Sequence, residues 1–113
     1  MKEKENMNNK YTEALDKFVE TIRVNSIKHY KEHNFTHMLE NPDVIKVNKG
    51  RRFDKVVKDT SVYCFVEKET GFIFKAATWR APQLKTKNPV RGSIYETSTY
   101  EGKAGPYGGW LYQ

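Results

Sequence analysis

The chain has 113 residues, of which 37% are hydrophobic and 13% aromatic, and its 20 Lys and Arg exceed its 14 Asp and Glu by six charges. This length suits one domain, because smaller pieces would bury too little apolar surface to be stable. No stretch of about 18 apolar residues is present, which excludes a membrane-spanning helix. The first ten residues also lack an apolar signal region, so we expect a cytoplasmic protein with no membrane partner.

The first predicted element is a long amphipathic helix from Asn9 to His33. Its apolar residues recur every three or four positions and so share one face: Tyr11, Leu15, Phe18, Val19, Ile22, Ile27 and Tyr30. A helix of about 25 residues is roughly 37 Å long. The rest of so short a chain does not readily cover that length. We therefore predict that residues 1–40 are helical and also join copies of the chain into a homodimer or a larger homo-oligomer.

A β-rich part, residues 41–113, follows the helix. Thr36 is predicted to cap a short helical turn that reaches Leu39 and stops before Pro42. The apolar and β-branched runs after it predict four strands: Val44–Val47, Phe53–Val57, Ser61–Glu67 and Gly71–Thr78. The loop before the last strand is short and ends in Gly71, which is typical of a hairpin closed by a glycine in the left-handed conformation.

The last third of the chain has few regular signals. Pro82 and Pro89 forbid a central strand, so residues 79–92 are predicted to form an ordered loop. The tail from Gly102 to Gln113 combines four glycines with large aromatic rings and is predicted to pack back onto the domain. The expected fold is α+β: the N-terminal helix packed on a small antiparallel sheet, with the basic loop and the tail beside it. The single cysteine, Cys64, lies in an apolar run and is expected to be a buried, reduced thiol.

The charge pattern of the loop points to a ligand. Residues 1–40 hold seven cations and seven acids, so the remaining residues carry the whole net charge. Between Thr70 and Tyr95 there is no carboxylate, and Trp79 lies among five cations: Lys75, Arg80, Lys85, Lys87 and Arg91. Cations beside an aromatic ring suit a ligand that carries phosphate and a ring. The plainer alternatives are a loop that is basic for solubility and a tryptophan that belongs to the core.

Two further segments are candidate binding elements. In Arg91-Gly92-Ser93, an arginine can grip phosphate, a glycine permits close approach and a hydroxyl can bond a ribose or a base edge. Tyr107, between glycines in the tail, can form one wall of a pocket, although a simple turn also explains it. We expect no cofactor and no catalytic set, since no serine or cysteine has a recognisable base beside it.

Metal binding is also not expected. His29, His33 and His37 are spaced by four residues, which on a continuous helix would place three imidazoles on one face. The predicted helix ends near Asn34, however, and no cysteine or carboxylate completes a tetrahedral ligand set.

Several blocks of the sequence resemble a set of small bacteriophage proteins. The blocks are Ser61–Val66, Gly71–Pro82 with its Lys-Ala-Ala-Thr-Trp-Arg-Ala-Pro run, Arg91–Tyr95 with Arg-Gly-Ser-Ile, and Gly105–Gly108. With its added N-terminal helix the chain is similar to the first family of Thoeris anti-defence proteins, known as phage sponges. Two departures are visible: the link Gln83–Val90 is longer than the pattern has, and the tail lacks the terminal arginine that the pattern often carries.

The resemblance implies a function. Such sponges sequester cyclic ADP-ribose isomers made by bacterial TIR-domain enzymes, without cleaving them, and so block abortive infection in the host cytoplasm. They assemble as dimers and larger rings. By motif position, Trp79 would stack on the base and Ser93 would bond the ligand, with Arg91 and Tyr107 as further pocket candidates. Lys75 and Arg80 from the charge pattern and Gly92 from the Arg-Gly-Ser segment complete the predicted binding residues.

Two other functions fit the composition. The first is a phage DNA- or RNA-binding protein that uses the basic loop and its aromatic residues. A net charge of +6 favours binding to the negatively charged phosphate backbone. Against it, the chain has no helix-turn-helix, RNP-like strand or zinc module, and its long helix is neutral. An adaptor that inhibits a host enzyme through its aromatic tail also stays open.

Overall fold

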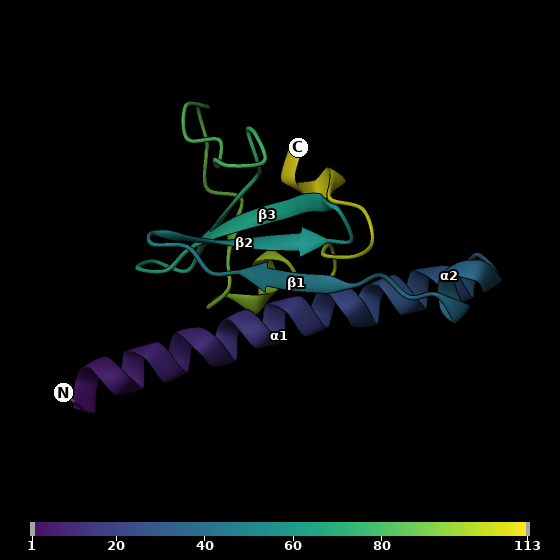
Figure 1. The fold of residues 1–113 in the computed structure, drawn as a ribbon, viewed down its shortest axis with the longest axis horizontal. Helices are drawn as coiled ribbons and strands as arrows, with labels where there is room; N and C mark the ends of the chain where they lie inside the picture. Colours follow the sequence, from purple (N-terminus) through teal and green to yellow (C-terminus); the bar gives the residue numbers. More distant parts are fainter. Residues whose placement is uncertain (1, 113) are drawn as a thin grey trace.

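A computed structural model describes residues 2–112, with side chains from residue 9 to residue 112. The fold is α+β, as predicted (Figure 1). The helix α1 (Lys2–Glu32) is followed by α2 (Thr36–Glu40) and an antiparallel sheet with strand order β1-β2-β3-β4-β5. The strands are β1 (Ile45–Asn48), β2 (Phe53–Lys58), β3 (Ser61–Glu67), β4 (Phe72–Phe74) and β5 (Gly92–Ser93), and two short 3-10 helices, η1 (Thr97–Thr99) and η2 (Gly109–Tyr112), complete the chain.

The helix α1 packs on one face of the sheet, here called the inner face. Six of the seven stripe residues are buried, each at most 9% exposed: Tyr11, Leu15, Phe18, Val19, Ile22 and Tyr30. The first five belong to the core between α1 and the sheet, whereas the Tyr30 hydroxyl donates a hydrogen bond to Asp43. Phe18 meets the ring of Tyr100 edge-on, with 4.8 Å between the ring centroids. Burying each large apolar side chain contributes about 1.5–3 kcal/mol, so this stripe is the main support of the fold.

One stripe assignment was wrong. Ile27 is 41% exposed, whereas its neighbour Ser26 is 3% exposed. Helical spacing places position 26, four residues after Ile22, on the buried face. The Ser26 hydroxyl can occupy that place because it donates a hydrogen bond of 2.6 Å to the Ile22 carbonyl.

The ends of the helices also refine the prediction. The helix α1 begins at Lys2, seven positions before the predicted Asn9, and ends where Asn34 adopts a positive φ of 56°. The Phe35 N–H then donates to the Tyr30 carbonyl at 2.8 Å, which is the bond of a Schellman cap. The predicted cap at Thr36 was wrong: Phe35 is the N-cap of α2, and no side chain caps that helix.

Within one chain, the sheet and the tail cover the apolar stripe of α1. Its buried neighbours on the inner face include Val56, Cys64, Val66 and Ile73. The length of the helix therefore does not by itself require a second copy of the chain. The homo-oligomer stays a prediction. Cys64 is fully buried, as expected, and burial raises the pKa of its thiol.

The inner face also holds a buried carboxylate. Asp54 is fully buried and accepts hydrogen bonds from the Tyr11 hydroxyl at 2.8 Å and the Gly50 N–H at 3.0 Å. The ammonium groups of Lys49 and Lys68 lie 3.7 Å and 3.5 Å from its oxygens. A buried charge requires such partners, and here they join α1 to the loops at one end of the sheet.

The strands match the prediction in the centre and differ at the edges. The hairpin between β3 and β4 is confirmed, and Gly71 has a φ of +74°. The strand predicted for Gly71–Thr78 was too long, because pairing ends at Phe74 and the chain then folds into a narrow loop. The strand predicted to begin at Val44 begins at Ile45. Gly92 was placed in the loop, but Gly92 and Ser93 form β5 opposite β4.

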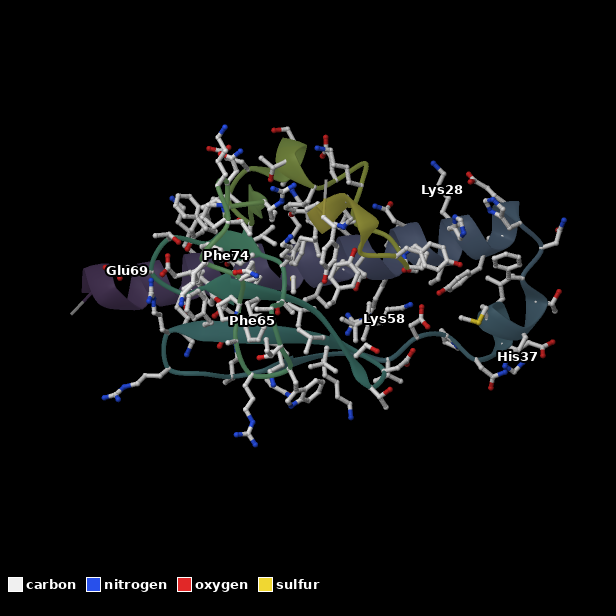
Figure 2. The ribbon with its side chains drawn as sticks, turned by 90° about the horizontal axis from the view of Figure 1, so that it is seen from above. Lys28, His37, Lys58, Phe65, Glu69 and Phe74 are labelled. Atoms are coloured by element: carbon white, nitrogen blue, oxygen red, sulfur yellow. The ribbon has the colours of Figure 1, made fainter. Side chains whose placement is uncertain are left out.

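The opposite side of the sheet, the outer face, carries a row of phenylalanines. Phe65 is in register with Phe74 and lies on the outer face because successive side chains of a strand alternate between faces. Phe53 meets both rings edge-on, at 6.4 Å and 5.7 Å between centroids. Figure 2 looks onto this face, with α1 behind the sheet. Phe65 and Phe74 are only 3% and 5% exposed.

The tail packs back onto the domain, as predicted, and it runs from α1 toward the outer face. Near α1 the Asn25 side-chain amide donates to the Glu101 and Ala104 carbonyls, both at 2.8 Å. Farther on, the Tyr63 hydroxyl donates to the Gly105 carbonyl and accepts from the Trp110 indole N–H, each at 2.9 Å. Leu111 is fully buried. The last residue of the predicted tail, Gln113, lies outside the described residues.

Candidate functional site

The loop after β4 presents Trp79 at its tip. The loop is closed by pairing of Ala76 with Pro82 and by a hydrogen bond of 2.9 Å from the Ala77 N–H to the Ala81 carbonyl. Inside it, the Thr78 hydroxyl oxygen accepts from the N–H groups of Arg80 and Ala81, at 3.2 Å and 3.1 Å. These bonds hold the tip in one conformation, in which Trp79 is 49% exposed and Arg80 lies beside it in solvent.

A lysine of the sheet meets the Trp79 ring. The Lys55 ammonium nitrogen lies 4.0 Å from the ring centroid, which is a cation–π contact. Lys55 reaches the ring because it stands opposite Phe65 in β3 and therefore points to the outer face. The contact fixes the ring while leaving about half of the tryptophan open to a ligand.

A second pair of the same kind involves the tail. The Lys75 ammonium nitrogen lies 5.0 Å from the centroid of the Tyr112 ring, and Tyr112 is 60% exposed. Lys75 directly follows Phe74, and Tyr112 is the last residue of η2, which Leu111 anchors in the core. We call the surface made by Lys55, Lys75, Trp79, Arg80 and Tyr112 the cation–aromatic face.

Acids of the adjoining strands face other partners. The Glu67 carboxylate accepts from the Arg52 guanidinium at 2.9 Å and from the Thr70 hydroxyl at 2.7 Å. The Asp54 carboxylate is buried on the inner face. The lysines of the cation–aromatic face therefore keep their charge available for an anion.

The residues of the Arg91-Gly92-Ser93 segment mainly pack and form hydrogen bonds within the domain. The Ser93 side chain is 8% exposed, and its hydroxyl oxygen accepts from the Tyr95 N–H at 3.1 Å. Gly92 packs against Thr99, whose hydroxyl oxygen would lie 3.1 Å from an added Cβ, so close packing explains this glycine. Arg91 donates from Nη1 to the Asn88 carbonyl at 3.1 Å, while its Nε is buried with no hydrogen-bond partner among the described residues.

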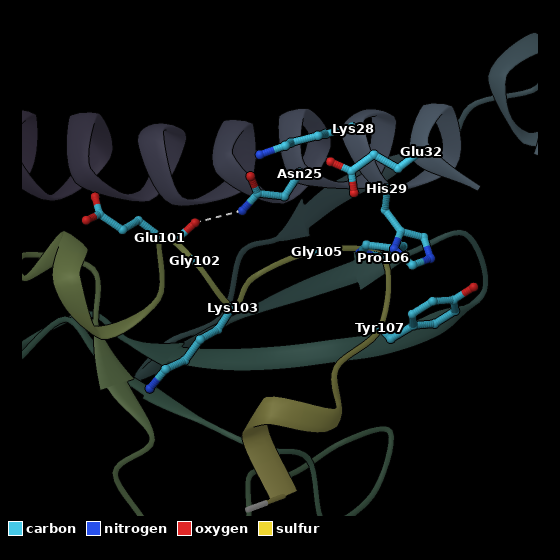
Figure 3. A pocket seen from close by; sticks show the side chains of 10 residues that line it. All are labelled: Asn25, Lys28, His29, Glu32, Glu101, Gly102, Lys103, Gly105, Pro106 and Tyr107. Atoms are coloured by element: carbon cyan, nitrogen blue, oxygen red, sulfur yellow. Dashed lines mark hydrogen bonds between the residues drawn. The ribbon is translucent and has the colours of Figure 1, made fainter. Parts of the chain in front are cut away.

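Tyr107 belongs to a different surface. It lines a groove of about 400 Å³ between the second half of α1 and the tail (Figure 3), together with nine other residues: Asn25, Lys28, His29, Glu32, Glu101, Gly102, Lys103, Gly105 and Pro106. The Tyr107 ring meets His29 edge-on at 5.3 Å between centroids and lies 5.9 Å from the Lys58 ammonium. We call this the α1–tail groove.

The charges of the α1–tail groove are balanced. Its two lysines, Lys28 and Lys103, are matched by the carboxylates of Glu32 and Glu101. None of the other six predicted binding residues lines it. Lys75, Trp79 and Arg80 therefore lie outside the groove, and Tyr107 lies in a surface whose lysines and carboxylates are balanced.

Two residues of the cation–aromatic face were missed from the sequence. Lys55 lies in a strand, far along the chain from Trp79, and only the pairing of β2 with β3 brings it to the outer face. Tyr112 was noted as a packing residue of the tail. The alternation of β2, with Lys55 between two inward positions, was the one signal that could have placed the lysine on the outer surface.

Among the described residues, the groups with a raised pKa are the Cys64 thiol and the phenols of Tyr11, Tyr30, Tyr63, Tyr95 and Tyr100. Burial raises the pKa of Tyr11, Tyr30 and Tyr63, and hydrogen bonds to Asp54 and Asp43 raise those of Tyr11 and Tyr30 further. Each of these residues has a structural partner that explains its position. None of the groups with a raised pKa belongs to the cation–aromatic face.

The histidines do not converge on one point. His29 and His33 stack with 4.1 Å between ring centroids, whereas His37 lies on α2. Among the described residues, no group of three or more His, Cys, Asp or Glu is placed to hold a metal ion. Within residues 2–112, no helix is both long enough and apolar enough to cross a membrane.

A family model, DUF7717, described as a family of unknown function, matches residues 1–113. The chain belongs to the DUF7717 family. Neither a curated protein nor a solved structure matches it. The function of this DUF7717 protein is therefore argued from its own residues.

Proposed function

We propose that this protein binds a small nucleotide on its cation–aromatic face and holds it without cleaving it. The observation that carries the proposal is the half-exposed ring of Trp79, with the Lys55 ammonium 4.0 Å from its centroid and Arg80 next to it in the chain. A flat ring stacks on a nucleobase, and the adjacent cations bind phosphate. The loop hydrogen bonds support the proposal because a preorganised ring loses little entropy on binding.

The resemblance to phage sponges refines the proposal. In that interpretation the ligand is a cyclic ADP-ribose isomer made by a TIR-domain enzyme, the protein acts in the cytoplasm of the infected host, and capture blocks abortive infection. Sequestration requires tight binding and no turnover. A surface that combines stacking and phosphate-binding groups, with no activated nucleophile or base, supports storage over catalysis.

The test is capture. Purified protein is incubated with the small-molecule products of a TIR-domain enzyme, washed and heat-denatured, and the released compounds are identified by mass spectrometry. We expect an intact cyclic nucleotide from the wild type. Recovery of a cleaved product would show that the protein is an enzyme that hydrolyses the nucleotide. A supernatant without any nucleotide would refute the proposal that the protein sequesters it.

Two variants make the capture test specific to the site. Trp79→Ala should weaken nucleotide affinity by about fivefold or more, because stacking of one base on an aromatic ring is worth about 1–3 kcal/mol. It should cost the fold only about 1 kcal/mol, since an exposed cation–π contact is worth no more than that. The control is Tyr107→Ala, which removes an exposed ring from the α1–tail groove and should leave capture unchanged. Equal capture by wild type and Trp79→Ala would refute the assigned site.

A second candidate function is binding of single-stranded nucleic acid. The exposed cations of the loop, Arg80, Lys85 and Lys87, extend from the cation–aromatic face and could follow a phosphate backbone. Salt separates the two functions. Polyanion affinity should fall steeply and linearly with the logarithm of salt concentration, whereas a nucleotide held by stacking and a few enclosed hydrogen bonds should lose much less.

A further inference from the structure

We infer that Thr78 donates its hydroxyl proton to a phosphate of the ligand, while the oxygen of the same hydroxyl holds the loop around Trp79 in place. This inference rests on the proposed function and goes beyond it by assigning a phosphate contact to a further residue. Thr78 is exposed and directly precedes Trp79 in the chain. Because consecutive Cα atoms lie about 3.8 Å apart, Thr78 is beside the ring that the proposed function uses.

The Thr78 hydroxyl has one hydrogen-bonding position left. A threonine hydroxyl can accept two hydrogen bonds and donate one. The Thr78 oxygen already accepts two, from the Arg80 N–H at 3.2 Å and from the Ala81 N–H at 3.1 Å. Among the described residues, no group accepts its proton. The hydroxyl can therefore meet a ligand only as a donor, which requires an acceptor atom on the ligand.

Two other threonines show what a fully used hydroxyl looks like in this fold. The Thr70 hydroxyl accepts from a backbone N–H at 3.2 Å and donates to the Glu67 carboxylate at 2.7 Å. The Thr99 hydroxyl accepts from a backbone N–H at 3.0 Å and donates to the Glu96 carbonyl at 2.6 Å. Both have an acceptor within the domain. Thr78 differs from them because its proton faces solvent at the tip of the loop.

The charges around Thr78 favour an anionic acceptor. Arg80 is exposed two residues farther along the chain, and the Lys55 ammonium lies 4.0 Å from the centroid of the Trp79 ring. No carboxylate occurs between residues 70 and 95. Hydrogen bonds to an ionised acceptor are shorter and stronger than those between neutral groups, and threonine hydroxyls commonly contact phosphate oxygens. A phosphate is therefore the acceptor that this hydroxyl and its neighbouring cations fit together.

The experiment compares ADP-ribose, which has an adenine and a pyrophosphate, with adenosine, which has no phosphate. Binding is measured by NMR titration of the full chain labelled with nitrogen-15. We expect the wild type to bind ADP-ribose at least about tenfold more tightly than adenosine, because a hydrogen bond to a charged group contributes a factor of about ten or more. Thr78→Val keeps the shape and removes the hydroxyl, so it should lose about that factor for ADP-ribose. Thr78→Ser restores the hydroxyl and should bind within about twofold of the wild type.

A third variant separates holding the loop from contacting phosphate. In Thr78→Asp, a side-chain oxygen can accept the two backbone N–H groups, but it has no proton to donate and it repels phosphate. Affinity for ADP-ribose should fall at least about tenfold, whereas affinity for adenosine should stay within about twofold. The amide protons of Arg80 and Ala81 should exchange with solvent slowly in Thr78→Asp, as in the wild type, and faster in Thr78→Val.

The matched control is Thr60→Asp. Thr60 is an exposed threonine in the turn between β2 and β3, so this variant adds the same charge away from the loop after β4. It should bind both compounds as the wild type does. Thermal unfolding of every variant shows that each remains folded.

The outcomes separate this inference from the proposed function. Unchanged affinity of Thr78→Val for ADP-ribose would overturn the inference. Equal weakening of ADP-ribose and adenosine in Thr78→Asp would also overturn it and keep a nucleotide site at Trp79, because residue 78 would then act through the loop alone. Equal losses in Thr60→Asp and Thr78→Asp would reduce the effect to net charge and overturn the contact. If the wild type binds neither compound, the inference is overturned, and the capture test then decides the proposed function alone.

Discussion

The two faces of the sheet use aromatic residues in opposite ways. On the inner face, Phe18 of α1 meets the ring of Tyr100 edge-on, and both residues are fully buried. On the outer face, Phe65 and Phe74 are also buried, whereas Trp79 in the loop after β4 is 49% exposed. The regular helix closes one face, whereas the loop and the tail close the other only in part. Stability and binding are therefore expected to depend on different faces.

The largest expected effect is on the inner face. Phe18→Ala should lower the free energy of unfolding by about 4 kcal/mol, because it removes a fully buried ring and leaves a cavity. Urea unfolding followed by circular dichroism measures the loss. The matched control on the same helix is Val24→Ala, at a side chain that is 54% exposed, and it should change stability by about 0.5 kcal/mol or less. Similar losses in the two variants would contradict the inner core.

The second-largest expected effect is a fall in the free energy of unfolding at high pH. The pKa values of Tyr11 and Tyr63 are raised above the ordinary 10.0 by burial, so the folded protein keeps phenol protons that the unfolded chain releases. Because the unfolded state then binds fewer protons, stability is complete below about pH 10 and falls as pH rises above it. Urea midpoints measured at about pH 8 and about pH 11 test this.

A tyrosine variant assigns that pH effect. Tyr11→Phe removes one of the buried phenols and should show a shallower loss of stability between the two pH values. Tyr107→Phe, at an exposed ring, should keep the slope of the wild type. The assignment fails if Tyr11→Phe keeps the full slope.

The smallest expected effect concerns the α1–tail groove. Lys103→Ala removes one cation from a groove whose lysines and carboxylates are balanced. Nucleotide capture should stay within about twofold of the wild type, whereas Lys55→Ala on the cation–aromatic face should weaken it by about tenfold. The same mass-spectrometric assay measures both. A larger loss in Lys103→Ala than in Lys55→Ala would move the site to the groove.

Much of the fold could be predicted because its signals are local. The period of α1, the hairpin at Gly71, the buried Cys64 and the returning tail all follow from residue types within short windows. Predictions failed where contacts with other parts of the chain determine which residue is buried or paired. Ser26 occupies a core position that apolar spacing gave to Ile27, and β5 is two residues long, too short to show any period.

The candidate site was predicted only in part for the same reason. The sequence identified Trp79, Arg80 and Lys75 as neighbours in a basic loop, and the structure adds a contact of Lys55 with Trp79 and one of Lys75 with Tyr112. It also grouped Tyr107 with them through a motif in the tail. The tail reaches α1 before it crosses to the outer face, so Tyr107 faces His29 and Tyr112 faces Lys75.

By itself, the sequence determined an amphipathic helix, a β-hairpin and a basic loop without acids, since each depends on the order of neighbouring residues. Only the tertiary structure decided which lysine meets which ring. Lys55 reaches Trp79 through the register of β2 with β3, and Lys75 reaches Tyr112 because Leu111 anchors η2. The physical reason is that a cation–π contact acts over a few ångströms in space, while the residues that form it here come from separate strands, a loop and the tail.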